Sequence, residues 1–246
     1  MTGRPLPGGF RLERLWTVAS TNDVARSRGE AGELEGLVVT AVEQTAGRGR
    51  YGRNWTSPAG NLYLSLLLRP NVPLAETGSV SLILALAMAE AIEDATEGRL
   101  QPRVKWPNDL LLGRAKIAGI LLEGDPRFLV AGIGVNLMLS PEGAPYPVGS
   151  LAAAGEEGVT PDFLLAAFLE RLRPRYDRWR ESGFSGQRTE WLARAAGIGE
   201  PAVLRLGTEE RRGTLADVGE DGSILLANAM GCMERFTAGE LFFGDS

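Results

Sequence analysis

The sequence predicts a mixed α/β fold followed by a small β-rich unit at the C-terminal end. Short β-branched segments alternate with segments of helical period through residues 10–196. Only short strand-like segments follow from residue 202 to 246, at Ala202–Leu206, Arg211–Val218, Ile224–Ala227 and Met230–Thr237. Asp221-Gly222 marks a hairpin turn among them. Polar residues cluster where the predicted strands end, which is a frequent position for ligand sites in α/β proteins.

Composition excludes several classes of protein. The chain has 246 residues and a net charge of −5. It has no histidine, which excludes His-based catalytic triads and argues against a zinc site. Cys232 is the single cysteine, so no internal disulfide can form, and we expect a cytoplasmic protein. Residues 1–10 do not resemble a signal peptide, and Leu82–Ala89 is too short to cross a bilayer. The acidic balance argues against nucleic-acid binding.

The N-terminal part is predicted to be a strand followed by a helix. Fewer than 20 residues precede Ser20, whereas a DNA-binding domain would need about 50. Ser20-Thr21-Asn22-Asp23 is typical of a helix start, with Asp23 as the partner in a capping box. The same four residues would present free N–H groups and hydroxyls to a polar ligand.

A glycine–arginine loop, residues 47–55, follows the strand predicted at Leu37–Val42 and the linking Gln44. Glycine lets the backbone approach a ligand closely, and arginine donors match carboxylate and phosphate oxygens. The string Gly-Arg-Gly-Arg-Tyr-Gly-Arg-Asn-Trp therefore predicts an anion-binding loop. Taken alone, it is equally compatible with a solvated basic loop.

Asn61–Leu68 is predicted to be an alternating strand and Thr77–Thr96 a core helix.

A second unusual stretch interrupts the strand predicted after this helix. Lys105-Trp106-Pro107-Asn108-Asp109 then breaks an apolar run, because proline removes a backbone donor and constrains the residue before it. A simple hairpin turn would also explain this string.

Two further polar residues lie at strand ends. Lys116 opens an apolar strand, and Asn136 follows the strand predicted at Phe128–Val135. A buried amide needs hydrogen-bond partners, and a purine edge is one candidate for Asn136. Residues 141–149 form a loop that could act as a lid, and helices are predicted at residues 161–180 and 187–196.

These motifs, in this order and spacing, resemble those of the biotin–protein ligases. The resemblance rests on Ser20-Thr21-Asn22, the glycine–arginine loop, Lys105–Asp109, Lys116–Leu121 and Gly132–Leu137. It implies a mixed-sheet catalytic domain of the class II synthetase-like kind over residues 1–197 and an SH3-like barrel over residues 198–246. Without a preceding DNA-binding domain, the chain looks like the monofunctional form.

The resemblance implies that ATP and biotin form biotinyl-5′-AMP, and that a lysine of a biotin carboxyl carrier domain then takes the biotinyl group. For biotin, it points to Ser20, Thr21, Asn22, Gln44, Arg48, Gly49, Arg50 and Lys116. For ATP, it points to Arg50, Trp55, Lys105, Asn108, Lys116 and Asn136, with Asn136 on the adenine side. The catalytic set is Arg50, Lys105, Asp109 and Lys116, and Asp109 is expected to bind Mg²⁺ or to orient the incoming lysine.

Three other functions stay open at this stage. A lipoate–protein ligase of the same superfamily is the nearest, followed by a non-enzymatic binding module and a DNA-binding repressor. Tyr51 stands where relatives can carry arginine, which would weaken the charge of the loop. Neither the carrier protein nor a homodimer interface can be read from these residues.

Overall fold

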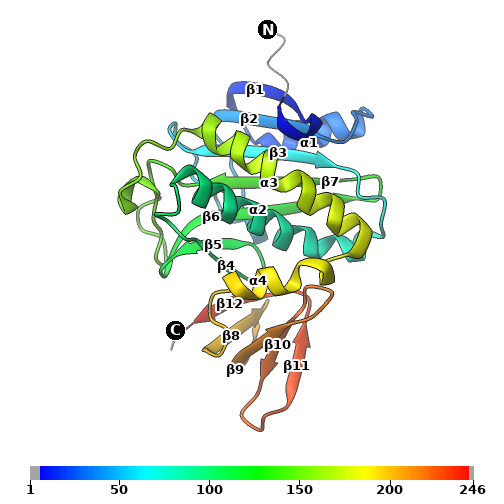
Figure 1. Ribbon diagram of the computed structural model, residues 1–246, viewed down its shortest axis with the longest axis vertical. Coiled ribbons are helices and arrows are strands. Elements are labelled where there is room, and N and C mark those ends of the chain that lie inside the picture. Colours follow the sequence, from blue (N-terminus) through cyan, green and yellow to red (C-terminus); the bar gives the residue numbers. More distant parts are fainter. Residues whose placement is uncertain (1–5, 244–246) are drawn as a thin grey trace.

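The computed structural model describes residues 6–243, except for the side chains at positions 74 and 75. A seven-stranded sheet forms the larger part, and a five-stranded antiparallel sheet lies at one end of it (Figure 1). The predicted mixed α/β fold with a β-rich C-terminal unit is therefore confirmed. None of the helices in the described part of the chain is long and apolar enough to cross a membrane.

The large sheet is mixed, as expected. Its strands are β1 (Arg11–Val18), β2 (Leu37–Gln44), β3 (Leu62–Leu68), β4 (Arg103–Lys105), β5 (Asp109–Leu112), β6 (Ala115–Asp125) and β7 (Phe128–Val135). Their order is β1-β2-β3-β7-β6-β5-β4. Only β1 and β2 pair in parallel, and the remaining neighbours are antiparallel.

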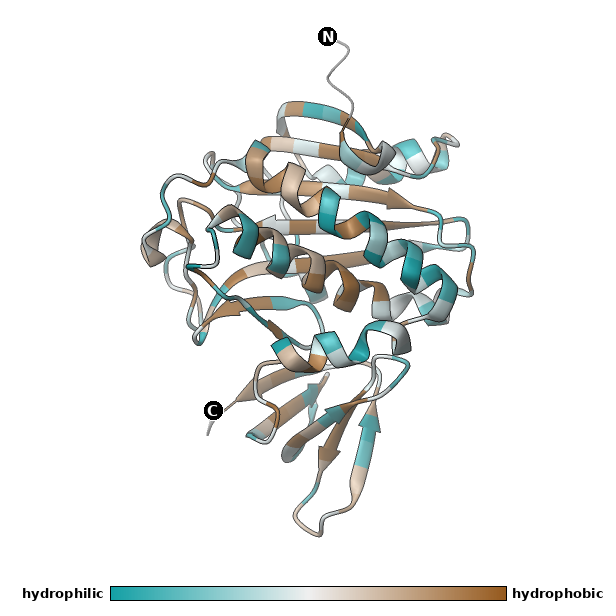
Figure 2. Ribbon diagram, viewed as in Figure 1, coloured by the Kyte–Doolittle hydropathy of each residue, from teal (hydrophilic) through white to brown (hydrophobic). Residues whose placement is uncertain are grey.

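Helices cover the two faces of this sheet unequally. On one face lie α2 (Val80–Ala95) and α3 (Pro161–Ser182), whose outward turns are hydrophilic (Figures 1 and 2). On the other face, α1 (Thr21–Glu30) packs over β2, β3 and β7. Successive β2 residues Val38 and Val39 accordingly belong to different apolar clusters. Because α1 is short, it does not cover the part of this sheet face that β5 and β6 form. The cavity described below lies there.

The strand β3 differs from its prediction. All seven of its residues are buried, so the expected alternation of apolar and polar positions is absent. The cause is its central place in the sheet, where helices cover both of its faces.

The C-terminal unit has one strand more than predicted. Its strands are β8 (Pro201–Leu206), β9 (Glu209–Val218), β10 (Ile224–Ala227), β11 (Met233–Phe236) and β12 (Glu240–Phe243), in the order β11-β10-β9-β8-β12. The four-residue β12 was not predicted, and β11 begins at Met233 instead of Met230. Leu204, Leu215 and Ile224 join the main apolar core, so the unit packs against the large domain.

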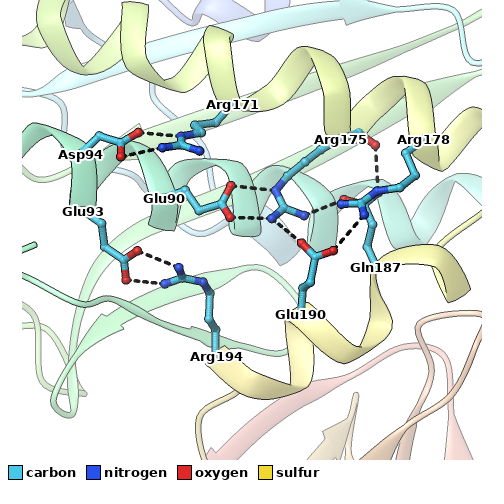
Figure 3. A network of polar contacts seen from close by, with 9 residues as sticks. All are labelled: Glu90, Glu93, Asp94, Arg171, Arg175, Arg178, Gln187, Glu190 and Arg194. Carbon is cyan, nitrogen blue, oxygen red and sulfur yellow. Dashed lines mark hydrogen bonds and ion pairs between the residues drawn. The ribbon is translucent and has the colours of Figure 1, made fainter.

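Polar contacts of α4 (Arg188–Arg194) join the helices α2 and α3 to the C-terminal sheet. Arg175 of α3 is 8% exposed and donates to Glu90 of α2, to Gln187 and to Glu190 of α4 (Figure 3). From the start of α4, Arg188 donates to the carbonyl of Val218, at the end of β9, at 2.6 Å. The helix layer thus holds the C-terminal sheet through α4.

Candidate active site

A cavity of about 470 Å³ lies on the sheet face that α1 leaves uncovered. Its lining comes from the start of α1, the glycine–arginine loop, β4 to β7, residues 145–147 and the C-terminal sheet. Every site residue predicted from the sequence lines it, with the exception of Asn136. The structure therefore brings together motifs that are up to about 100 residues apart in the chain.

Glycines of two central strands form the floor of the cavity. A Cβ atom at Gly132 would lie 2.3 Å from Asn22 Oδ1, and one at Gly134 would lie 2.5 Å from Trp55 Nε1. A Cβ at Gly119 of β6 would lie 3.0 Å from the same indole. These glycines were not predicted as site residues, although glycine inside a strand can mark a close approach of a ligand or a side chain.

The start of α1 supplies one polar wall. Ser20 Oγ accepts a hydrogen bond from the Asn22 backbone N–H at 3.3 Å, which confirms Ser20 as the N-cap. Asp23 does not complete the expected capping box, because its carboxylate accepts two hydrogen bonds from Arg48. The Arg48 guanidinium holds the pKa of Asp23 below its usual value.

A buried hydroxyl connects the polar groups of this wall. Gln44 Oε1 accepts from the backbone N–H of Thr21 at 2.8 Å and from its hydroxyl at 3.1 Å. Ser65 Oγ of β3 lies 2.7 Å from Thr21 Oγ1 and 2.6 Å from Asn22 Oδ1. Ser65 was not predicted, since nothing local distinguishes it from other small residues in an apolar strand.

The glycine–arginine loop folds back on itself beside this wall. Its backbone is closed by hydrogen bonds from Gly49 to Arg53 and from Trp55 to Gly47, of 2.8 and 2.9 Å. Arg50 Nη1 lies 3.0 Å from the Gly239 carbonyl and 3.3 Å from Asn108 Oδ1. Burial lowers the pKa of the Arg50 guanidinium.

The indole of Trp55 is also part of the cavity. Its Nε1–H is buried and has no hydrogen-bond partner within residues 6–243. Buried donors without a partner are rare and costly in native proteins. A ligand oxygen in the cavity could accept this hydrogen bond.

The break between β4 and β5 places a carboxylate among cations. Asp109 Oδ1 lies 2.6 Å from Lys116 Nζ, and its Oδ2 lies 4.0 Å from Lys105 Nζ. Burial lowers the pKa of Lys105, while the charge of Asp109 acts in the opposite direction. Lys105–Asp109 reverses the chain between β4 and β5, as the turn interpretation expects, and the same residues line the cavity.

Asn136 is buried beside the 141–149 loop. Its Nδ2 donates to the Gly149 carbonyl at 2.9 Å, and its backbone N–H donates to Ile117. The buried amide finds its partner in the chain itself, and the residue does not line the cavity. Asn136 thus holds the end of the 141–149 loop through its Nδ2 group, and its place on the adenine side stays a prediction.

The carboxylates around the cavity do not form a metal site. Within the described residues, no three acidic, histidine or cysteine side chains are grouped so as to hold an ion. The Asp109 carboxylate is already engaged by lysine, and the second lining carboxylate, Glu240, pairs with Arg53. The residues present therefore do not fit a magnesium ion held by the protein alone.

The charge of the cavity is opposite to that of the whole chain. Seven cationic side chains and two carboxylates line it, in a protein with a net charge of −5. The cations are Arg48, Arg50, Arg53, Lys105, Arg114, Lys116 and Arg205. A cavity of this kind concentrates anions, and next to the polar wall it suits a molecule that joins an uncharged polar ring to an acid group.

Comparison with known proteins agrees with this geometry. The family model described as "Biotin/lipoate A/B protein ligase family" matches residues 17–139. A biotin–[acetyl-CoA-carboxylase] ligase from Paracoccus denitrificans is 38% identical over 220 residues, which cover 84% of this chain and 90% of that protein. This chain belongs to the biotin/lipoate A/B protein ligase family.

Solved structures of ligases from this family show the same fold. The biotin protein ligase from Aquifex aeolicus in complex with biotin and ATP superposes with a TM-score of 0.84 at 28% identity, over 95% of this chain and 99% of that one. The biotin protein ligase from Leishmania major in complex with biotinyl-5-AMP gives a TM-score of 0.65 at 27% identity, covering 93% and 99% of the two chains. The predicted architecture is thus the architecture of these ligases.

Proposed function

We propose that this chain is a biotin–protein ligase that joins biotin and ATP into biotinyl-5′-AMP and transfers the biotinyl group to a lysine of a biotin carboxyl carrier domain. One observation carries the proposal. A single cavity combines the polar wall of Ser20–Asn22 and Gln44 with a cationic region around Arg50 and Lys116. The named relatives and the solved complexes support biotin over lipoate as the substrate.

The polar wall suits the ureido ring of biotin. That ring has N–H donors and a carbonyl acceptor, and the wall offers Ser20 and Thr21 hydroxyls with the amides of Asn22 and Gln44. The link through Ser65 restricts Thr21 and Asn22 before any ligand arrives. A prearranged wall loses less conformational entropy on binding.

In the first step, a biotin carboxylate oxygen attacks the α-phosphorus of ATP. The new P–O bond forms as the bond to the β-phosphate oxygen breaks, and pyrophosphate leaves with the electron pair. Two anions must approach each other for this reaction. Arg50 and Lys116 line the cavity where they can offset that repulsion and the charge of the transition state.

In the second step, the carrier lysine attacks the acyl carbon of the mixed anhydride and AMP leaves. The amine loses a proton as the C–N bond forms, and no enzyme nucleophile is required. Asp109 is the carboxylate beside Lys116, at 2.6 Å, so we assign it to orient the incoming amine. Residues 48–50, 53–55 and 145–147 come from loops that line the cavity, and they would limit the access of water to the anhydride.

Magnesium fits this scheme as part of the substrate. ATP carries the ion on its phosphates, and the described residues of the site supply cations and no group of carboxylates that could hold the ion.

We also propose that the catalytic domain ends near Gly197, where the chain turns at φ = +78° before β8 begins. Gln187–Arg194 would then be the last helical segment of that domain.

The test is pyrophosphate exchange into ATP with biotin, lipoate or neither as the acid. Exchange that depends on biotin and not on lipoate supports the proposal. Exchange that depends on lipoate would replace it with the lipoate ligase alternative. If neither acid supports exchange, the chain does not activate acids through adenylation.

A further inference from the structure

Two cationic side chains lie close to one aromatic ring of the C-terminal sheet. Lys105 Nζ of β4 lies 5.4 Å from the centroid of the Phe242 ring, and Arg205 Cζ of β8 lies 4.4 Å from it. Both distances are within the range of cation–π contacts. All three residues line the cavity, although about 100 residues separate Lys105 from Arg205.

A series of contacts connects these groups to Lys116, which is proposed to act on the reacting groups. Lys116 pairs with Asp109 at 2.6 Å, Asp109 lies 4.0 Å from Lys105, and Lys105 contacts the Phe242 ring. Arg205 contacts the same ring. The contacts therefore extend from Lys116, which is proposed to bind the acid group and the α-phosphate, to the C-terminal sheet.

The guanidinium of Arg205 retains free donors. Glu210 accepts a hydrogen bond from its Nε at 2.9 Å. No hydrogen bond involves its Nη groups within residues 6–243. Its side chain is 43% exposed, so it can reach a ligand in the cavity without first leaving a buried ion pair.

We propose that Arg205, placed by Phe242, forms with Lys105 an anion subsite for the β- and γ-phosphates of ATP and for the leaving pyrophosphate. This inference rests on the proposed function, because that function supplies the nucleotide. It gives the C-terminal sheet a direct part in binding substrate. A planar guanidinium suits this position, since it can donate two parallel hydrogen bonds to one phosphate group.

The chain offers a matched control for Arg205. Arg212 of β9 also pairs with Glu210, at 3.1 Å, but it does not line the cavity. Arg205→Leu and Arg212→Leu therefore remove the same type of side chain and a contact with the same carboxylate. Only the first removes a charge from the cavity.

The first experiment titrates the intact chain and both variants with inorganic pyrophosphate alone, by calorimetry. We expect Arg205→Leu to raise the pyrophosphate Kd about tenfold, as for loss of a hydrogen bond to a charged group, and Arg212→Leu to leave it unchanged. Equal affinity in Arg205→Leu and the parent would overturn the subsite. An equal loss of pyrophosphate affinity in the two variants would also overturn it, and so would a parent protein that does not bind pyrophosphate.

The second experiment separates the subsite from the reaction. With ATP varied, Arg205→Leu should raise the KM for ATP while the Kd for biotin stays at the parent value, and Arg205→Lys should recover part of the loss. A changed biotin Kd with an unchanged KM for ATP would contradict the assignment. If the parent binds pyrophosphate through Arg205 but makes no adenylate from biotin, the proposed function fails and the anion subsite stands.

Discussion

Arg48 of the glycine–arginine loop donates two hydrogen bonds to the carboxylate of Asp23, over distances of 2.9 and 2.5 Å. Asp23 lies in the first turn of α1, directly after the residues of the polar wall. The pair therefore attaches the loop to the helix that is proposed to bind biotin. Glu123 of β6 lies 3.8 Å from the same guanidinium and accepts a hydrogen bond from Asn22 at 2.8 Å.

Replacing Asp23 by Asn should weaken biotin binding by loosening this attachment. Because both side chains are more than one third exposed, the effect is modest, and we expect the biotin Kd to rise about two- to fivefold. Calorimetry measures the change. Asp162→Asn breaks a comparable exposed pair with Arg14, outside this cavity, and should leave the Kd unchanged.

Replacing Arg50 by Gly should let the adenylate escape while its synthesis largely continues. The half-buried guanidinium contacts Gly239 and Asn108 and is placed to hold a phosphate that remains after pyrophosphate leaves. We expect the half-life of the enzyme–biotinyl-AMP complex to fall at least about tenfold. Retention equal to that of the parent, measured by rapid gel filtration, would refute this role.

Replacing Lys116 by Ala should nearly abolish the first step. The change removes the cation that offsets carboxylate–phosphate repulsion and leaves Asp109 without its closest ion-pair partner. We expect the rate of biotin-dependent pyrophosphate exchange to fall about 10²- to 10³-fold. A near-parent exchange rate would show that Lys116 does not act on the reacting groups.

Replacing Gly132 by Ala should disturb the polar wall without changing its residues. The new Cβ would lie 2.3 Å from Asn22 Oδ1, so the Asn22 amide must move away from Ser65. We expect the biotin Kd to rise about tenfold or more, as hydrogen bonds to biotin are lost. Gly158→Ala is the control, since its Cβ would meet nothing within 4 Å.

Acid should destabilise the fold through Glu190 of α4. Burial acts to raise the pKa of Glu190, but hydrogen bonds from Arg175 and Arg178 outweigh it and keep the pKa below the usual value. A carboxylate with a lowered pKa in the folded state contributes stability above its unfolded pKa of about 4.3 and loses it as the pH falls through the folded value.

Because the Glu190 side chain is 42% exposed and solvent screens its ion pairs, the variant Glu190→Gln should be less stable at pH 7 by at most about 1 kcal/mol. It should also lose less further stability below about pH 4.3. Urea unfolding at several pH values measures both effects. Glu181→Gln provides the control, because Glu181 makes no ion pair within residues 6–243. Parallel stability–pH curves for the parent and Glu190→Gln would contradict the role of this network.

The parts of the site that local sequence predicts are those carried by short motifs. Ser20–Asn22, Arg48–Arg50 and Lys105–Asp109 combine unusual residue types with turns or strand ends, so their position could be anticipated. Ser65 and Gly132 were missed because their importance depends on neighbours from distant segments.

The contribution of the C-terminal sheet was missed for a related reason. Glu240 and Phe242 lie on a four-residue strand, which is too short to give a clear periodic pattern. Lys105 reaches the Phe242 ring, which Arg205 also contacts, through the packing of the two sheets. For Asn136, the sequence predicts that a buried amide needs partners, and the structure shows one of them, the Gly149 carbonyl, in a loop of the same chain.

The most direct test of the whole account is the mass of a biotin carboxyl carrier domain after incubation with the intact chain, biotin, ATP and magnesium. We predict a gain of one biotinyl group on a single carrier lysine, dependent on ATP and absent with the Lys116→Ala variant. An unchanged carrier mass, under conditions in which an established biotin ligase modifies the same domain, would contradict it.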